Sequence, residues 1–124
     1  LEKVDEALTY LQQSRMINQK LGDLDGEAKS LGYIGSALVI MGKLDDATIA
    51  YEERIALAQK LNDHRGMAKG NWNLGKVLIK QRNYRAGLEY LYKCVEYEKS
   101  AGDPAWEDDL KVIKSIETAF NGAD

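Results

Sequence analysis

The sequence has one cysteine, one proline and one histidine among its 124 residues. A lone cysteine excludes a disulfide within the chain, so nothing in the sequence requires an oxidising compartment. The low proline content argues against disorder, and the 11 glycines recur at loop and helix-contact positions instead of forming a flexible run. With 44% hydrophobic and 30% charged residues, the composition is that of an ordinary globular protein of about one domain.

Long apolar runs are also missing. No stretch approaches the roughly 20 apolar residues that span a bilayer, and the opening residues have the wrong polarity for a signal peptide. We therefore expect a cytoplasmic protein without a membrane span. Strand signals are missing too, because apolar and polar residues show no sustained alternation. The chain starts without methionine inside a helical pattern, so we expect it to be cut from a longer array.

What the sequence does contain is a repeat. The segment from Leu21 to Gly26 returns as Leu61 to Gly66 and, in weaker form, as Ala101 to Trp106, at an offset of forty residues each time. Self-similarity at a fixed period of this length is the signature of a repeat architecture.

Apolar residues between these loops recur at three- and four-residue steps, which is the pattern of amphipathic helices. The pattern predicts an all-α fold of about six helices, at about residues 3–21, 26–41, 44–61, 67–81, 84–101 and 103–120. Short connections make neighbouring helices antiparallel. We expect Gly22 to end the first helix and Asp23 or Asp25 to cap the second, because a short acceptor side chain satisfies free amides of a first turn.

Two copies of a known pattern can be aligned on this repeat. The first comprises Ile34-Gly35, Leu38, Gly42 to Ala47, Tyr51 and Ile55, and the second comprises Leu74-Gly75, Leu78, Asn83 to Gly87, Leu91 and Val95. These residues resemble the consensus of the tetratricopeptide repeat (TPR) family. The forty-residue spacing and the stretch Asn73-Leu74-Gly75 are similar to the long Leu-Gly-Asn subtype, found in scaffolds that link G-protein α subunits to the spindle-orientation machinery.

The resemblance implies a right-handed superhelical solenoid of antiparallel helix pairs. It divides the chain into a leading half repeat (1–22), two TPR units (23–62 and 63–102) and a C-terminal capping helix (103–124). Two departures stand out. Arg82 lies forty residues after Gly42, where the repeat predicts a glycine, and Ser115 lies where the repeat predicts a helix-contact glycine. The second departure favours a cap that shields the end of the array.

The small residues of the repeat have a physical role that is independent of the family name. Gly35, Gly75 and Gly87 are expected to let helix backbones approach closely, while Tyr51 and Leu91 fill the space between successive pairs.

The sequence offers few residues that could support catalysis. His64 is interpreted as a solvated turn residue or helix cap, and Cys94, on the inward stripe of its helix, as a small buried hydrophobe. Adjacent acids such as Asp45-Asp46 and Glu107 to Asp109 lie in first turns, where capping explains them better than acid–base or metal chemistry. Walker loops, zinc-ligand spacings and nucleophile elbows are absent from the sequence. We therefore predict no enzyme, no cofactor and no metal site.

One charge pattern stands out. Between Asp63 and Glu89 the chain has no acidic residue, although its net charge is −3. Within this acid-free segment Lys69, Asn73, Lys76 and Lys80 recur at steps of four, three and four residues, which places them on one helix face beside Trp72. One repeat earlier the matching face carries Lys29, Tyr33, Ser36 and Ile40.

These positions resemble the ones that line the concave groove of TPR arrays. A lysine-rich helix face is also typical of a plain solvated surface, but the acid-free segment and the asparagine favour a binding surface. We predict a non-catalytic scaffold that binds a protein or peptide, acidic in character. The peptide-binding residues are Lys29, Tyr33, Ser36, Lys69, Trp72, Asn73, Lys76 and Lys80. Lysines would attract carboxylates of the partner, and Asn73 would hydrogen-bond its backbone.

Two other functions remain open. The chain could be a structural spacer in a longer array, or its basic helix could bind single-stranded RNA. The acidic pI, near 5.2, and the confinement of the basic charge to one helix disfavour nucleic acid. In addition, the apolar residues of the first helix cannot all be covered by one neighbour, so we expect weak self-association or fraying through residues 1–21.

Overall fold

The computed structural model describes residues 2–123, so Leu1 and Asp124, the outer ends of the predicted half repeat and cap, lie outside the described residues. The described chain is all-helical and contains no strand. Its six helices are α1 (Glu2–Leu21), α2 (Leu24–Ile40), α3 (Leu44–Lys60), α4 (His64–Lys80), α5 (Tyr84–Ala101) and α6 (Ala105–Ala123). No helix in the described range is long and apolar enough to cross a bilayer.

The predicted helices agree with the observed ones except at a few ends. One of the two largest differences is the start of α4, which lies at His64 and not at Met67. The Asp63 carboxylate accepts a hydrogen bond from the Gly66 amide at 2.9 Å, so the capped first turn already includes His64. His64 is therefore the exposed first residue of a helix and neither its cap nor a loop residue. At the other end of the chain, α6 continues three residues beyond the predicted end at Phe120.

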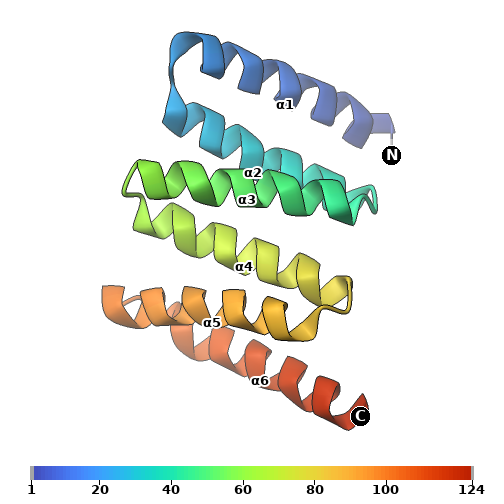
Figure 1. The fold of residues 1–124 in the computed structure, drawn as a ribbon, viewed down its shortest axis with the longest axis vertical. Coiled ribbons are helices and arrows are strands. Elements are labelled where there is room, and N and C mark those ends of the chain that lie inside the picture. The colour runs from blue at the N-terminus through green and yellow to red at the C-terminus, as the bar shows by residue number, and fades with distance from the viewer. Residues whose placement is uncertain (1, 124) are drawn as a thin grey trace.

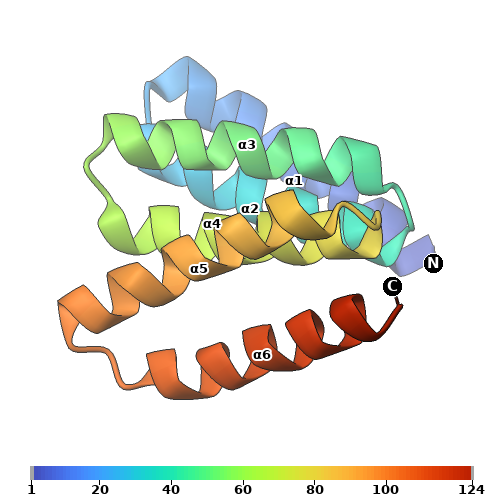
Figure 2. The ribbon, with the colours of Figure 1, turned by 60° about the horizontal axis from the view of Figure 1, so that its bottom comes forward.

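Each helix packs against the next one in the chain. In Figure 1 the helices follow one another from α1 to α6 along the longest axis, and successive connections lie alternately at the two sides of the stack. The two ends of the chain therefore lie at opposite ends of the molecule. Figure 2 shows α6 beside α5, at the end of the stack that is far from α1.

A single backbone motif ends each of the first five helices. A residue with positive φ recurs every twenty positions, at Gly22, Gly42, Asn62, Arg82 and Gly102, with φ between 54° and 77°. The next amide then donates to a carbonyl five residues back, as from Lys43 to Leu38 at 2.9 Å and from Asn83 to Leu78 at 2.8 Å. This is the Schellman arrangement, which satisfies carbonyls that the helix end leaves free. Arg82, the departure noted in the sequence, thus keeps the glycine-like backbone conformation.

The positive φ of Arg82 leads to a stability prediction. A side chain in the left-handed region costs about 1–2 kcal/mol, and glycine avoids this cost. Glycine also makes the unfolded chain more flexible, which offsets roughly 0.5–1 kcal/mol of that gain. We expect Arg82→Gly to raise the free energy of unfolding by about 0.5–1 kcal/mol, measured by urea denaturation. Asn62→Gly is the matched control and should gain less, because asparagine tolerates this conformation better. A variant no more stable than the parent would show that Arg82 is not strained.

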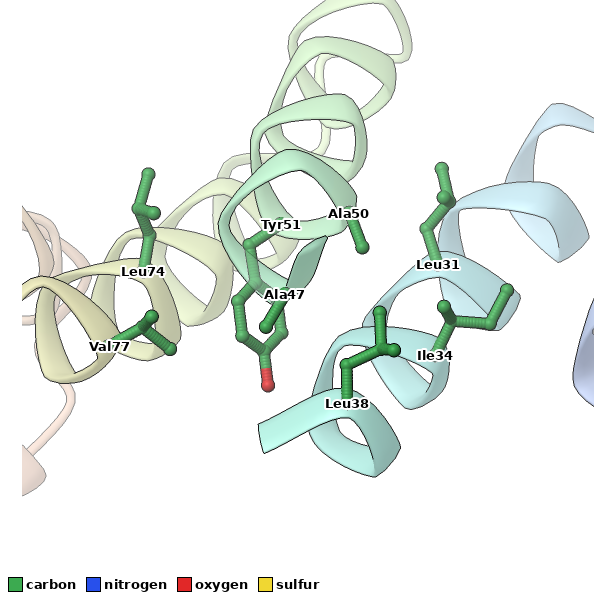
Figure 3. Close-up of a cluster of buried hydrophobic side chains, with 8 residues drawn as sticks. All are labelled: Leu31, Ile34, Leu38, Ala47, Ala50, Tyr51, Leu74 and Val77. Atoms are coloured by element: carbon green, nitrogen blue, oxygen red, sulfur yellow. The ribbon is translucent and has the colours of Figure 1, made fainter. Parts of the chain in front are cut away.

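The main core forms where α2, α3 and α4 meet. Figure 3 shows the Tyr51 ring of α3 lying between residues of α2 and residues of α4. The cluster consists of Leu31, Ile34, Leu38, Ala47, Ala50, Tyr51, Leu74 and Val77. A second cluster, formed by Leu91, Val95 and Ile113, joins α5 to α6. Tyr51 and Leu91 therefore fill the spaces between helices, as the sequence predicts.

Glycine permits two different close contacts. A Cβ added to Gly75 would stand 2.8 Å from the Gly87 carbonyl oxygen, and one added to Gly87 would stand 2.9 Å from the Gly75 carbonyl, so α4 and α5 meet backbone to backbone. At Gly35 the neighbour is different, since an added Cβ would lie 2.6 Å from the Tyr51 ring. The predicted backbone approach holds for α4 and α5, whereas Gly35 makes room for an aromatic side chain.

We expect Gly75→Ala to destabilise the fold by about 1–3 kcal/mol, because the new methyl group meets a backbone carbonyl that cannot move freely. This loss should outweigh the gain in helix propensity that alanine normally brings. Gly32→Ala is the control: its methyl group would meet Arg54 Nε at 2.7 Å, on a flexible side chain that can shift. Thermal unfolding of both variants tests the contact, and equal losses would remove the special role of the Gly75–Gly87 approach.

Candidate functional site

The faces of α2 and α4 that the sequence predicts to bind a peptide meet at a hollow of about 200 Å³. We call it the lysine hollow; it is lined by Ser36, Val39, Ile40, Tyr51, Asn73, Lys76, Val77 and Lys80. Four of the eight predicted site residues thus come together there, Ser36 from α2 and the other three from α4. The lysine side chains are exposed, whereas Asn73 is partly buried.

A hydrogen bond fixes one wall of the lysine hollow. The hydroxyl groups of Tyr51 and Ser36 are 3.0 Å apart, and Ser36 Oγ lies 3.2 Å from the Gly32 carbonyl to which it donates. The tyrosine hydroxyl is then the donor in the first contact. The Asn73 amide and the ammonium groups of Lys76 and Lys80 are donors that a ligand could use.

A second hollow, of about 480 Å³, lies between α1 and α2. We call it the tyrosine hollow; it is lined by Lys3, Val4, Ala7, Tyr10, Leu11, Tyr33, Ser36, Ala37 and Ile40. Ser36 and Ile40 line both hollows, so the two adjoin, and we call them together the groove; its lining residues come from α1, α2, α3 and α4. The tyrosine hollow is mostly apolar: Tyr33 and Ile40 are each 65% exposed and offer large surfaces to a ligand.

The charge along this groove has one sign. The charged residues among its lining are Lys3, Lys76 and Lys80, and neither hollow is lined by an acid. The acid-free segment of the sequence explains this at α4, because its first turn holds no acid and its last turn ends in a lysine. A positive rim beside an apolar floor favours ligands that carry both carboxylates and apolar side chains.

Three predicted site residues lie outside the linings of both hollows. Lys29 pairs with Asp25 at 3.0 Å one turn back on α2, and the hydrogen bond to this aspartate raises the lysine pKa. Lys69 is exposed one turn before Asn73 on α4. Trp72 packs against the α5–α6 cluster and is partly buried. Trp72, which the sequence predicts to bind the peptide, thus lies outside both hollows, and its ring packs against the neighbouring core.

The sequence did not predict that α1 and Tyr51 contribute to the groove. Tyr51 was assigned to packing alone, because its spacing fits the buried stripe; only the Ser36 contact shows that its hydroxyl reaches the hollow. Val4, Ala7 and Leu11 lie on the apolar face of α1, so they look like core residues in the sequence. The sequence signal that could have revealed this hollow was Tyr33 on the next helix, because it lines the same hollow as the apolar face of α1.

Another hollow, of about 440 Å³, is lined by residues of α3, α4 and α5. It includes Glu52 and Lys93, which carry opposite charges, and none of the predicted peptide-binding residues. Because its charge pattern selects neither acidic nor basic ligands, we place the candidate site in the groove.

Large exposed residues lie along α1, the helix for which the sequence predicts self-association. Tyr10, Ile17 and Leu21 are 70%, 57% and 75% exposed, and no residue of α1 is buried. Uncovered apolar side chains of this kind favour weak association.

We expect the chain to show a concentration-dependent sedimentation coefficient, and Ile17→Lys to abolish the dependence by placing a charge among these side chains. Ile49→Lys is the matched control, since Ile49 is 55% exposed but lies on α3. Sedimentation that does not change with concentration in the unsubstituted chain would contradict the prediction. Equal effects of the two lysines would move the contact away from α1.

Comparison with known proteins leaves the family open: neither the scan against family models nor the search of curated proteins found a match for this chain.

Proposed function

We propose that this chain is a TPR array, a right-handed superhelical solenoid of antiparallel helix pairs, with units at 23–62 and 63–102. The helix ends support this proposal, because a residue with positive φ, followed by the same hydrogen bond, recurs every twenty positions through five helices. The aspartate caps also recur at the forty-residue period, where Asp23 accepts from Gly26 and Asp63 from Gly66, both at 2.9 Å. The stretch 1–22 then acts as a half repeat and the stretch 103–124 as a cap.

We further propose that the array is a non-catalytic scaffold that binds an acidic peptide in the groove. The observation that carries the proposal is the lysine hollow, where Asn73, Lys76 and Lys80 gather beside an apolar hollow and no acid lines either part. The lysines attract and pair with carboxylates of the peptide. Asn73 has both a donor and an acceptor, so it can hydrogen-bond a peptide backbone group.

The tyrosine hollow supplies the apolar part of the binding energy. Tyr10 and Tyr33 present large faces with few rotatable bonds, which suits them to hold an aliphatic or aromatic side chain of the partner. A bound segment would thus place an apolar side chain over α1 and α2 and its carboxylates over α4.

The test is a charge reversal at the lysine hollow. Peptides that bind the chain are first selected from a random library, and we expect them to be enriched in Asp and Glu as well as in apolar residues. Lys76→Glu with Lys80→Glu should then weaken binding by about 30-fold, or 2 kcal/mol, because paired contact charges are lost and reversed. Fluorescence polarisation at fixed ionic strength measures the affinity.

The matched control reverses Arg82 and Arg85 in the same way. Both are exposed, belong to the same acid-free segment and line neither hollow of the groove, and the two double variants have equal net charge. Circular dichroism checks that each variant is folded. Equal losses would indicate only a diffuse basic field, and a larger loss from the arginine pair would place the binding surface elsewhere.

The alternative functions give different results in the same assay. A spacer within a longer array would select no peptide above background. Binding of single-stranded RNA would be competed by poly(U), with a steep dependence on salt.

A further inference from the structure

Three side chains that can bind a metal ion meet between α5 and α6, away from the groove. Cys94 and Glu98 lie one turn apart on α5, and Asp109 comes from the beginning of α6. The thiol sulfur and one carboxylate oxygen of each acid all lie within 4.8 Å of one another. Figure 2 shows the two helices running beside each other from the turn that joins them.

Two of the three residues are buried, Asp109 is partly exposed, and the cluster is incompletely bonded. Cys94 is 5% exposed and Glu98 is 8% exposed. Glu98 Oε1 is buried and has no hydrogen-bond partner among the described residues. Leaving a carboxylate oxygen unpaired in the interior is costly, so this oxygen points to a missing partner.

The surroundings do not supply a positive charge. None of the ion pairs within the described residues involves Cys94, Glu98 or Asp109. Lys99, the nearest basic residue in the sequence to Glu98, has its ammonium group 4.6 Å from the centre of the Trp106 ring. Asp103 adds negative charge nearby, and its carboxylate accepts a hydrogen bond from the Ala105 amide at 3.0 Å.

The titration behaviour agrees with this description. Burial, and after it the neighbouring Asp109, raises the pKa of Glu98 to about 7. Burial also raises the pKa of the Cys94 thiol to about 12, with Glu98 as the next contributor.

We propose that Cys94, Glu98 and Asp109 bind a divalent transition-metal ion of the zinc class. The ion supplies the positive charge that the cluster lacks, and it is the missing partner of the Glu98 oxygen. A thiolate with two carboxylates suits zinc, whereas calcium and magnesium prefer six or more oxygen ligands. Donor atoms on one tetrahedral zinc ion stand roughly 3.5 Å apart, given Zn–S near 2.3 Å and Zn–O near 2.1 Å, so small side-chain rotations close the site.

Three protein ligands leave one coordination position for water. The bound ion would join α6 to α5 beside the cluster of Leu91, Val95 and Ile113, and would stabilise the folded chain because the unfolded chain has no such site. A proton shared between Glu98 and Asp109 is the competing way to neutralise the pair, so the experiment must separate metal from proton.

The test uses the full chain without an affinity tag. Isothermal titration with ZnCl₂ should give one ion per chain, and saturating zinc should raise Tm by about 5 °C or more. Titration with CoCl₂ should produce a thiolate-to-cobalt charge-transfer band in the near ultraviolet, which reports the sulfur ligand directly and needs no variant. Zinc affinity should fall as the pH is lowered, because the ligands must lose their protons to bind.

Variants then assign the ligands. Cys94→Ser, Glu98→Gln and Asp109→Asn should each weaken zinc binding more than about tenfold, since even outer-sphere changes cost that much. Asp108→Asn is the matched control, as an exposed neighbour on the same helix, and should leave the affinity unchanged. The proposal is overturned if zinc fails to bind the parent chain, if cobalt gives no charge-transfer band, or if binding survives in Cys94→Ser and Asp109→Asn.

Discussion

The structure depends above all on one backbone constraint: the chain must end a helix about every twenty residues, and the backbone must turn in the same conformation each time. A left-handed residue followed by a hydrogen bond back to the fifth preceding carbonyl does this at all five helix ends. Because the motif resides in the backbone, it survives where the side chain changes, as at Arg82. Uniform connections give helices of similar length, and residues of α2 and α4 come together at the lysine hollow.

Close packing between helices is achieved in two ways. Gly75 and Gly87 allow two backbones to touch, whereas Gly35 accepts the ring of Tyr51. The difference matters for the candidate site, since the Tyr51 ring spans from the core to the lysine hollow and its hydroxyl contacts Ser36. A leucine at the position of Tyr51, as at Leu91 one repeat later, has no polar atom to offer there. Tyr51 of α3 therefore links the core to the lysine hollow by a hydrogen bond, whereas Leu91 of α5 makes no such link.

The helices and most of the buried stripe could be predicted from the sequence because apolar spacing and turn residues are local signals. The start of α4 was misplaced because Asp63 was read as part of a loop, although its spacing to Gly66 equals that of Asp23 to Gly26. Helical periodicity alone placed four of the eight predicted site residues at the lysine hollow. The packing of Trp72 against the α5–α6 cluster could not be predicted in this way, because the neighbour of a large side chain at the edge of a helix face depends on the position of the next helix. The group of Cys94, Glu98 and Asp109 was missed for a related reason: two of its members share a helix turn, but the third is brought in by the angle at which α6 returns to α5.

The groove and the buried cluster use ionisable groups in opposite ways. Lys76 and Lys80 are exposed, so water keeps them charged at little cost, and their attraction for a partner is long-ranged but weakened by salt. Glu98 is shielded from water, so its negative charge is costly. The carboxylate is stabilised most by a partner that binds in the interior, such as a proton or a metal ion. The positions of these groups in the stack follow the same division. The exposed lysines lie on α4, whereas Glu98 lies at the junction of α5 with α6, where the second core cluster contains three buried side chains. A small apolar core gains most from an additional contact, which is why a bound ion between α5 and α6 would stabilise this end of the stack more than its centre.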